Sequence, residues 1–104
     1  MRFLMRFQFP TEIGNKKMSD PQFGQKMQEL MKEINAEAVY LTSICGERGG
    51  YVALSFDDPS RIAAIAEQFF FWLNAEVEFM PVMAMEDLAR AAPDIKAAQA
   101  KWKV

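Results

Sequence analysis

Polar and apolar residues alternate along the start of the chain, over residues 2–9. One side of this segment carries Phe3, Met5, Phe7 and Phe9. The other side carries Arg2, Leu4, Arg6 and Gln8. Alternation with a period of two, together with aromatic residues, predicts a β-strand that has one buried face. Pro10 ends the strand, because proline has no backbone N–H to give to a neighbouring strand.

Two further segments carry apolar residues at helical spacing. The first covers residues 21–36 and follows Ser19-Asp20-Pro21, which places a capping side chain before a proline of the first turn. The second begins at Asp57-Asp58-Pro59-Ser60, where the two carboxylates are interpreted as a cap, and runs to about Asn74. Residues 11–20 are polar and predict a solvated loop. The alternative is a lid, with Lys16 and Lys17 meeting an anionic ligand.

Three more strands are predicted from β-branched and aromatic residues. Residues 38–45 and 51–56 form a hairpin around a glycine-containing turn at 46–50. Residues 76–83 form the fourth strand, and Pro81 favours an edge position for it. Residues 86–103 favour helix, interrupted at Pro93.

The order of elements is β-α-β-β-α-β followed by a helical tail, which is the ferredoxin-like order. We therefore expect an α+β fold with a four-stranded antiparallel sheet and both main helices on one face. At 104 residues the chain suits a single domain, with a core at 1–83 and a tail at 84–104. The first and fourth strands would be neighbours, so polar residues of opposite charge would meet across them. These are Arg2 and Arg6 on one strand and Glu76 and Glu78 on the other.

The sheet face turned away from the helices would mix charged, hydroxyl and apolar residues, among them Tyr40, Tyr51, Ile44 and Met80. Two interpretations are open: a solvated outer face with a few ion pairs, or an interface with a second copy of the chain. The second helix carries Phe69-Phe70-Phe71-Trp72, more aromatic surface than one buried stripe needs. A pocket, the tail or a partner would have to cover the rest.

Composition narrows the chemistry. The chain has no histidine, which excludes the commonest general base and the commonest metal ligand. Its single cysteine, Cys45, cannot form an intrachain disulfide or a structural zinc site, and we expect a cytoplasmic protein without a cofactor or metal. The net charge of −2 makes nucleic acid a poor partner. We expect no signal peptide and no membrane segment.

Three motifs carry a resemblance to a known group of proteins: Glu47-Arg48-Gly49-Gly50, Phe56-Asp57-Asp58-Pro59, and Phe79-Met80-Pro81-Val82-Met83 followed by Glu86-Asp87. Over residues 1 to about 90 the chain resembles a family of short bacterial proteins of unknown function. These look like members of the dimeric α+β barrel superfamily, which also contains muconolactone isomerases and small monooxygenases. The resemblance implies a homodimer whose sheets pack face to face, with a cavity between sheet and helices in each subunit. It supplies no catalytic residues.

These observations lead to three hypotheses. The first is a homodimer that binds a small, largely apolar molecule, with polar groups from Tyr40 or Tyr51. The apolar lining would be Phe7, Phe9, Phe23, Met27, Phe56, Phe69 and Phe79. The second is a cofactor-independent isomerase or monooxygenase, in which Tyr, Glu or Asp would move protons; a carboxylate or phenol with a shifted pKa in a closed cavity would favour it. The third is a structural dimer without a cavity.

Overall fold

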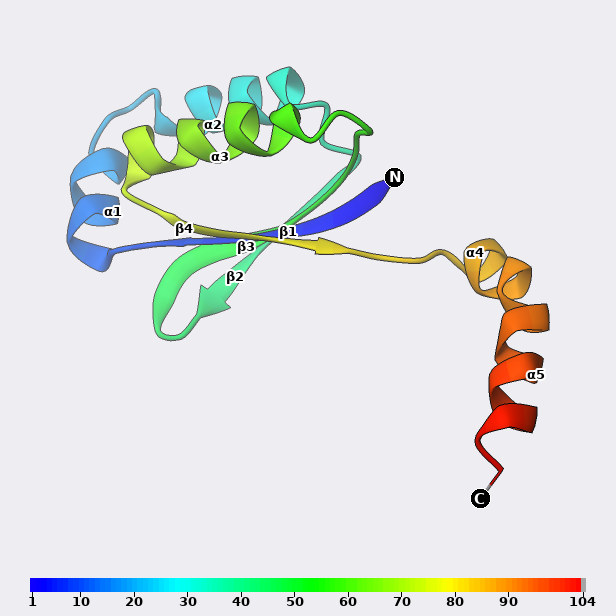
Figure 1. The fold of residues 1–104 in the computed structure, drawn as a ribbon. Helices are drawn as coiled ribbons and strands as arrows, with labels where there is room; N and C mark the ends of the chain where they lie inside the picture. Colours follow the sequence, from blue (N-terminus) through cyan, green and yellow to red (C-terminus); the bar gives the residue numbers. More distant parts are fainter. Residues whose placement is uncertain (104) are drawn as a thin grey trace.

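The computed structural model describes residues 1–103 and shows an α+β fold built on one open antiparallel sheet. The strands are β1 (Arg2–Phe9), β2 (Ala38–Ile44), β3 (Glu47–Ser55) and β4 (Glu76–Pro81), in the order β2-β3-β1-β4. Helices α2 (Phe23–Glu33) and α3 (Ser60–Leu73) lie side by side over one face of the sheet (Figure 1). The predicted pairing of the first and fourth strands is confirmed.

The hydrophobic core lies between this face and the two helices. Phe7 and Phe69 are almost fully buried, and their rings are 5.0 Å apart. The odd residues of β1 and the even residues of β3 point inward, because side chains alternate along a strand. On the edge strand β2 the same pattern fails to produce burial: Leu41 is 68% exposed although it lies on the helix side. Two hollows lined by side chains of α2 separate that helix from β2.

The prediction of a loop at residues 11–20 is wrong for most of that segment. Helix α1 (Thr11–Met18) begins directly after Pro10, and the backbone N–H of Gly14 donates to the Pro10 carbonyl at 2.9 Å. Gly14 and Asn15 are poor helix formers and the segment has no apolar stripe, so local pattern gives no helix signal. Tertiary packing decides the outcome, because Gly14 is buried against the sheet.

The hairpin between β2 and β3 also differs from the prediction. Its turn consists of Cys45 and Gly46, both with positive φ (50° and 79°), as a two-residue hairpin turn of type I′ requires. Strand β3 therefore begins at Glu47 and includes Arg48. Gly49 and Gly50 lie within the strand, where a Cβ atom would run into the backbone of β1 and β2 respectively.

The helical tail consists of α4 (Met85–Arg90) and α5 (Ala92–Lys101), and Pro93 lies in the first turn of α5. The tail leaves the body after β4, and its far end lies on the side of the sheet away from α2 and α3 (Figure 1). It therefore does not cover the aromatic residues of α3, and Phe71 is 88% exposed. Trp72 instead packs against Phe23, with ring centroids 5.2 Å apart. Val104, the last residue of the predicted tail, lies outside the described residues.

Candidate functional site

An apolar hollow of about 420 Å³ lies between α2 and the sheet, at the end of the sheet where α1 packs. We call it the Arg48 hollow. Four of the predicted pocket residues come together in it: Phe7, Phe9, Phe23 and Met27. Sequence analysis did not place the other lining residues there, which are Met18, Gly24, Gln28, Leu41, Thr42, Arg48 and Gly49.

The strand register shows which residues of the sheet border the hollow. On the helix side of the sheet, Phe7 of β1, Gly50 of β3 and Leu41 of β2 lie in one row across the strands. Phe7 and Leu41 of this row line the hollow, together with Gly49 rather than Gly50 of β3. The space above the sheet stays open, since Phe23 and Met27 of α2 are only partly buried there.

Arg48 is the one charged residue among those lining the hollow. It lies opposite Phe9 in the β1–β3 pairing, and its Nη2 donates a hydrogen bond to Asn15 Oδ1 of α1 at 3.0 Å. Its Nη1 is buried and has no hydrogen-bond partner among residues 1–103. A buried donor without an acceptor costs about 1–3 kcal/mol, and more when the group is charged. Arg48 is thus half-buried, with one guanidinium nitrogen shielded from water and without an acceptor.

A second apolar groove, of about 510 Å³, continues from the hollow along α2 and β2. We call it the α2–β2 groove. Met27, Gln28 and Leu41 line both spaces, so the two adjoin. The remaining lining residues of the groove are Met31, Lys32, Ala36, Glu37, Ala38 and Val39. Together the two spaces form an elongated apolar trough with Arg48 near one end.

The other predicted pocket residues lie elsewhere. Phe56 and Phe79 pack with Phe3: the rings of Phe3 and Phe56 stack at 4.4 Å, and Phe79 meets Phe56 edge-on at 6.0 Å. Neither ring lines the Arg48 hollow. Phe69 is completely buried beside Phe7 and fills the core.

Tyr40 and Tyr51 lie on the opposite side of the sheet, which we call the open face. There Tyr40, Tyr51, Arg6 and Glu78 form one row across all four strands. Arg6 Nη2 donates to Glu78 Oε2 at 2.9 Å, which is the cross-strand pair that the sequence predicts.

The prediction for Arg2 was wrong. Arg2 lies opposite Ser55 at the end of β1, and its Nε is 3.4 Å from Glu37 Oε2 rather than beside a β4 carboxylate. Glu76 pairs in register with Gln8. Gln8 in turn donates to Glu47 Oε1 at 3.0 Å. The open face therefore combines both signs of charge with the two tyrosines.

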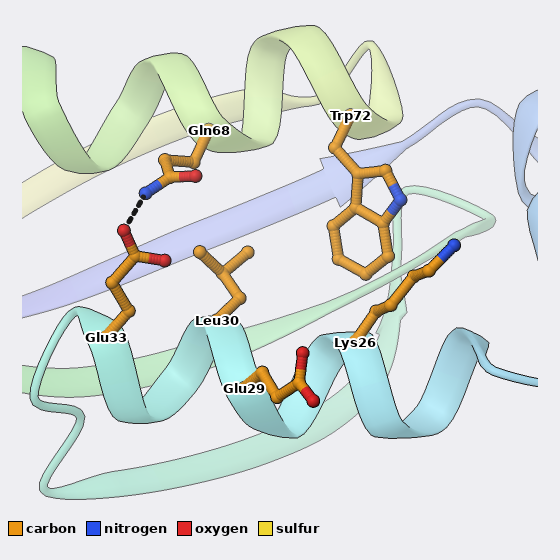
Figure 2. A pocket seen from close by; sticks show the side chains of 6 residues that line it. All are labelled: Lys26, Glu29, Leu30, Glu33, Gln68 and Trp72. Atoms are coloured by element: carbon orange, nitrogen blue, oxygen red, sulfur yellow. Dashed lines mark hydrogen bonds between the residues drawn. The ribbon is translucent and has the colours of Figure 1, made fainter.

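A smaller hollow of about 260 Å³ lies between α2 and α3 (Figure 2). Its polar groups already have protein partners: Gln68 Nε2 donates to Glu33 Oε1 at 3.0 Å, and Lys26 Nζ lies 2.8 Å from Asp20 Oδ2. The other side chains drawn there are Glu29, Leu30 and Trp72. Because these polar groups satisfy one another, this hollow is a weaker ligand site than the one at Arg48.

The carboxyl groups with shifted pKa values lie at the starts of elements rather than in the Arg48 hollow. The hydrogen bond from Lys26 lowers the pKa of Asp20, and the Gln22 backbone N–H lowers it further. The Ser60 backbone N–H lowers the pKa of Asp58. The prediction that Asp57 and Asp58 cap α3 was wrong, because the N-cap residue is Pro59 and Asp57 accepts a hydrogen bond from the N-terminal amine. Backbone hydrogen bonding also lowers the pKa of Asp87, through Ala84. None of these groups lines the hollow, and its lining contains no Asp, Glu or Tyr.

Within residues 1–103, no three Asp, Glu or Cys side chains gather closely enough to hold a metal ion. In the same range no helix combines the length and the apolar character that crossing a bilayer requires.

Comparison with known proteins identifies the family without assigning an activity. No curated protein matches the chain. One solved structure, the de novo designed protein Ferredog-Diesel, is 19% identical and aligns over 77% of this chain and 82% of its own, with a TM-score of 0.39. Residues 1–96 match the family model described as a domain of unknown function, DUF3303. Since the match spans nearly the whole chain, the protein belongs to the DUF3303 family.

Proposed function

We propose that this protein binds a small, largely apolar molecule in the Arg48 hollow and that it works as a homodimer with a ferredoxin-like, barrel-type fold. The observation that carries the ligand proposal is the hollow itself. Its volume of about 420 Å³ falls within the range of roughly 300–1,000 Å³ that is usual for small-molecule sites. Its lining is aromatic and methionine-rich with few polar groups, which is also usual for such sites.

The binding hypothesis explains the hollow better than the isomerase or monooxygenase alternative does. Acid–base catalysis needs a titratable group within hydrogen-bond reach of the substrate. The lining offers an arginine, a threonine and a glutamine as its polar side chains. Arginine stays protonated at physiological pH, so it suits binding an anion better than moving a proton.

The homodimer is proposed from the open face. Tyr40 is 66% exposed there, and within residues 1–103 no helix covers the face (Figure 1). The central strand carries Arg2 and Arg6 whereas the edge strand carries Glu76 and Glu78, so a copy related by a two-fold axis offers charges of both signs to match. The tail reaches toward this side with Met83 and Met85 exposed, and a second copy would bury them.

Native mass spectrometry of the untagged protein tests both parts. We expect a dimer that retains extra mass when purified, or that takes up decanol or decanoate when either is added. Met27→Glu should abolish uptake because it places a charge in the hollow. Phe71→Glu, at an exposed position of α3 away from the open face and outside the hollow, is the matched control. A protein that binds neither compound would overturn the ligand proposal.

The dimer part has its own variant. Tyr40→Asp should give a monomer, because it introduces an unpaired charge at the proposed interface, whereas Tyr40→Phe should remain a dimer. Circular dichroism separates a folded monomer from an unfolded chain. A monomeric wild type, or a Tyr40→Asp dimer with unchanged melting temperature, would contradict the proposed interface.

A further inference from the structure

Arg48 has no carboxylate partner within residues 1–103. Four side-chain cations in this range, Arg2, Arg6, Lys26 and Arg90, form ion pairs, and Arg48 is one of those that do not. Arg48 is held only by the neutral amide oxygen of Asn15. The neighbouring Glu47 cannot serve, because its Oε1 accepts a hydrogen bond from Gln8 and side chains alternate between the two faces of a strand.

The place of Arg48 in the fold makes its free bonding capacity useful to a ligand. Its side chain lines an apolar hollow. Nη1 is enclosed by Gly14 and Phe9 and is not open to the hollow, so a carboxylate would pair with the edge of the guanidinium formed by Nε and the exposed Nη2. A guanidinium presents its N–H groups in a fork that matches both oxygens of one carboxylate. In an apolar surrounding such a pair is stronger than in water, since the local dielectric constant is lower.

The rest of the trough restricts the remainder of the ligand. From Arg48 the lining continues through Phe23 and Met27 to Met31 and Val39, so a ligand held at Arg48 meets apolar side chains over its length. Lys32, at the far end of the α2–β2 groove, is exposed and lies in the same groove as Glu37. That end therefore carries both charges and remains in water.

We propose that the ligand is an elongated apolar monocarboxylate whose carboxylate pairs with Arg48 and whose chain lies along Met27 toward the α2–β2 groove. This inference rests on the proposed binding function and adds the chemical class of the ligand. It also moves the anion contact from Lys16 and Lys17, which the sequence suggests, to Arg48. Lys17 faces a different hollow, beside Phe71 and Trp72.

Isothermal titration calorimetry with three ligands of one chain length tests the class: decanoate, decanol and decylamine, each below its micelle concentration. Wild type should bind decanoate at least about tenfold more tightly than decanol, which corresponds to about 1.4 kcal/mol. Decylamine should bind most weakly. Arg48→Met, which keeps much of the side-chain length, should weaken decanoate binding about tenfold or more and leave decanol binding unchanged.

Two further variants separate the charge of Arg48 from its structural role. Arg48→Lys keeps the charge but loses the forked geometry, so decanoate binding should fall between wild type and Arg48→Met. Lys32→Met removes a cation at the other end of the trough and should leave the preference for decanoate unchanged. Thermal melting shows whether each variant is folded.

The outcomes distinguish the two proposals. If neither decanoate nor decanol binds to wild type, the binding function itself fails. If both bind with equal affinity, or if Lys32→Met rather than Arg48→Met removes the preference, the binding function stands and the assignment of Arg48 is wrong. An Arg48→Met variant that is unfolded leaves the Arg48→Lys comparison and the wild-type preference for decanoate to decide.

Discussion

Arg48 on β3 and Gly14 on α1 approach so closely that a Cβ atom at position 14 would lie 2.7 Å from Arg48 Nη1. The same atom would lie 2.9 Å from Cε2 of the buried Phe9 ring. Helix α1 can therefore close over this end of the sheet only because position 14 has no side chain. This contact links the helix that sequence analysis missed to the charged residue of the candidate site.

Gly14→Ala should destabilise the protein by about 1–2 kcal/mol. Arg48 can move aside, but the Phe9 ring is packed in the core, and overfilling such a site costs typically about 1–3 kcal/mol. Gly24→Ala is the matched control, because nothing lies within 4 Å of its added Cβ. In the control the helix preference for alanine should raise stability by up to about 1 kcal/mol. Urea unfolding measures both, and equal effects at the two sites would contradict the packing described for α1.

Two phenylalanines of α3 should respond oppositely to truncation. Phe69 is fully buried beside Phe7, so Phe69→Ala should cost about 3–5 kcal/mol. Phe71 is exposed, so Phe71→Ala should change stability by no more than about 0.5 kcal/mol. Denaturant unfolding of the pair tests the orientation of the helix. A large loss at Phe71 would mean that another surface covers it.

Cys45→Asn should stabilise the protein by about 0.5–1 kcal/mol. Cys45 has a φ of 50° in the β2–β3 turn, and asparagine tolerates this conformation better than cysteine does. Asn-Gly is also the preferred pair for a type I′ turn. At the second position of the turn, Gly46→Ala should destabilise the protein, since Gly46 has a φ of 79° that alanine rarely adopts. A loss of stability in Cys45→Asn, measured by thermal melting, would argue against this turn.

The Asp20–Lys26 contact should make the free energy of unfolding depend on pH in the acid range. The pKa of Asp20 lies below its ordinary value of 3.8, mainly because of the hydrogen bond from Lys26. The native state thus holds this proton more weakly than the unfolded chain does. The stabilisation is fully present above about pH 3.8 and is lost as the pH falls through the native value.

Asp20→Asn should therefore lower the melting temperature at neutral pH and have little effect in strong acid. Melting curves over this pH range provide the measurement, and Lys26→Met should produce the same pH dependence. A difference between Asp20→Asn and wild type that stays constant at every pH would contradict the linkage.

The sequence pattern predicts most of the sheet because alternation reports burial directly. The limits of β1 agree with the prediction, since Phe3 to Phe9 alternate without a break up to Pro10. The core positions of α2 and α3 follow in the same way from their apolar spacing, as Leu30 and Phe69 show.

The candidate site is harder to predict because it depends on register and on tertiary packing. The predicted turn at residues 46–50 includes Arg48, so the sequence analysis did not place this residue on the sheet. A two-residue turn at Cys45-Gly46 would have placed Arg48 opposite Phe9 on the helix side. The exposure of Leu41 depends on how far α2 reaches across the sheet, which no local pattern encodes. Four of the lining residues were nevertheless predicted correctly, because aromatic side chains and methionine on inward faces are the usual lining of apolar sites.

The position of the ligand can be read most directly from the methionine methyl groups. NMR spectra of protein labelled at the methionine methyl carbons should show that added decanoate shifts the signals of Met18 and Met27, which line the Arg48 hollow. The signals of Met83 and Met85, which lie exposed between β4 and the tail and at the start of the tail, should stay in place. Shifts at Met83 and Met85 without shifts at Met18 and Met27 would place the ligand elsewhere and contradict the proposed site.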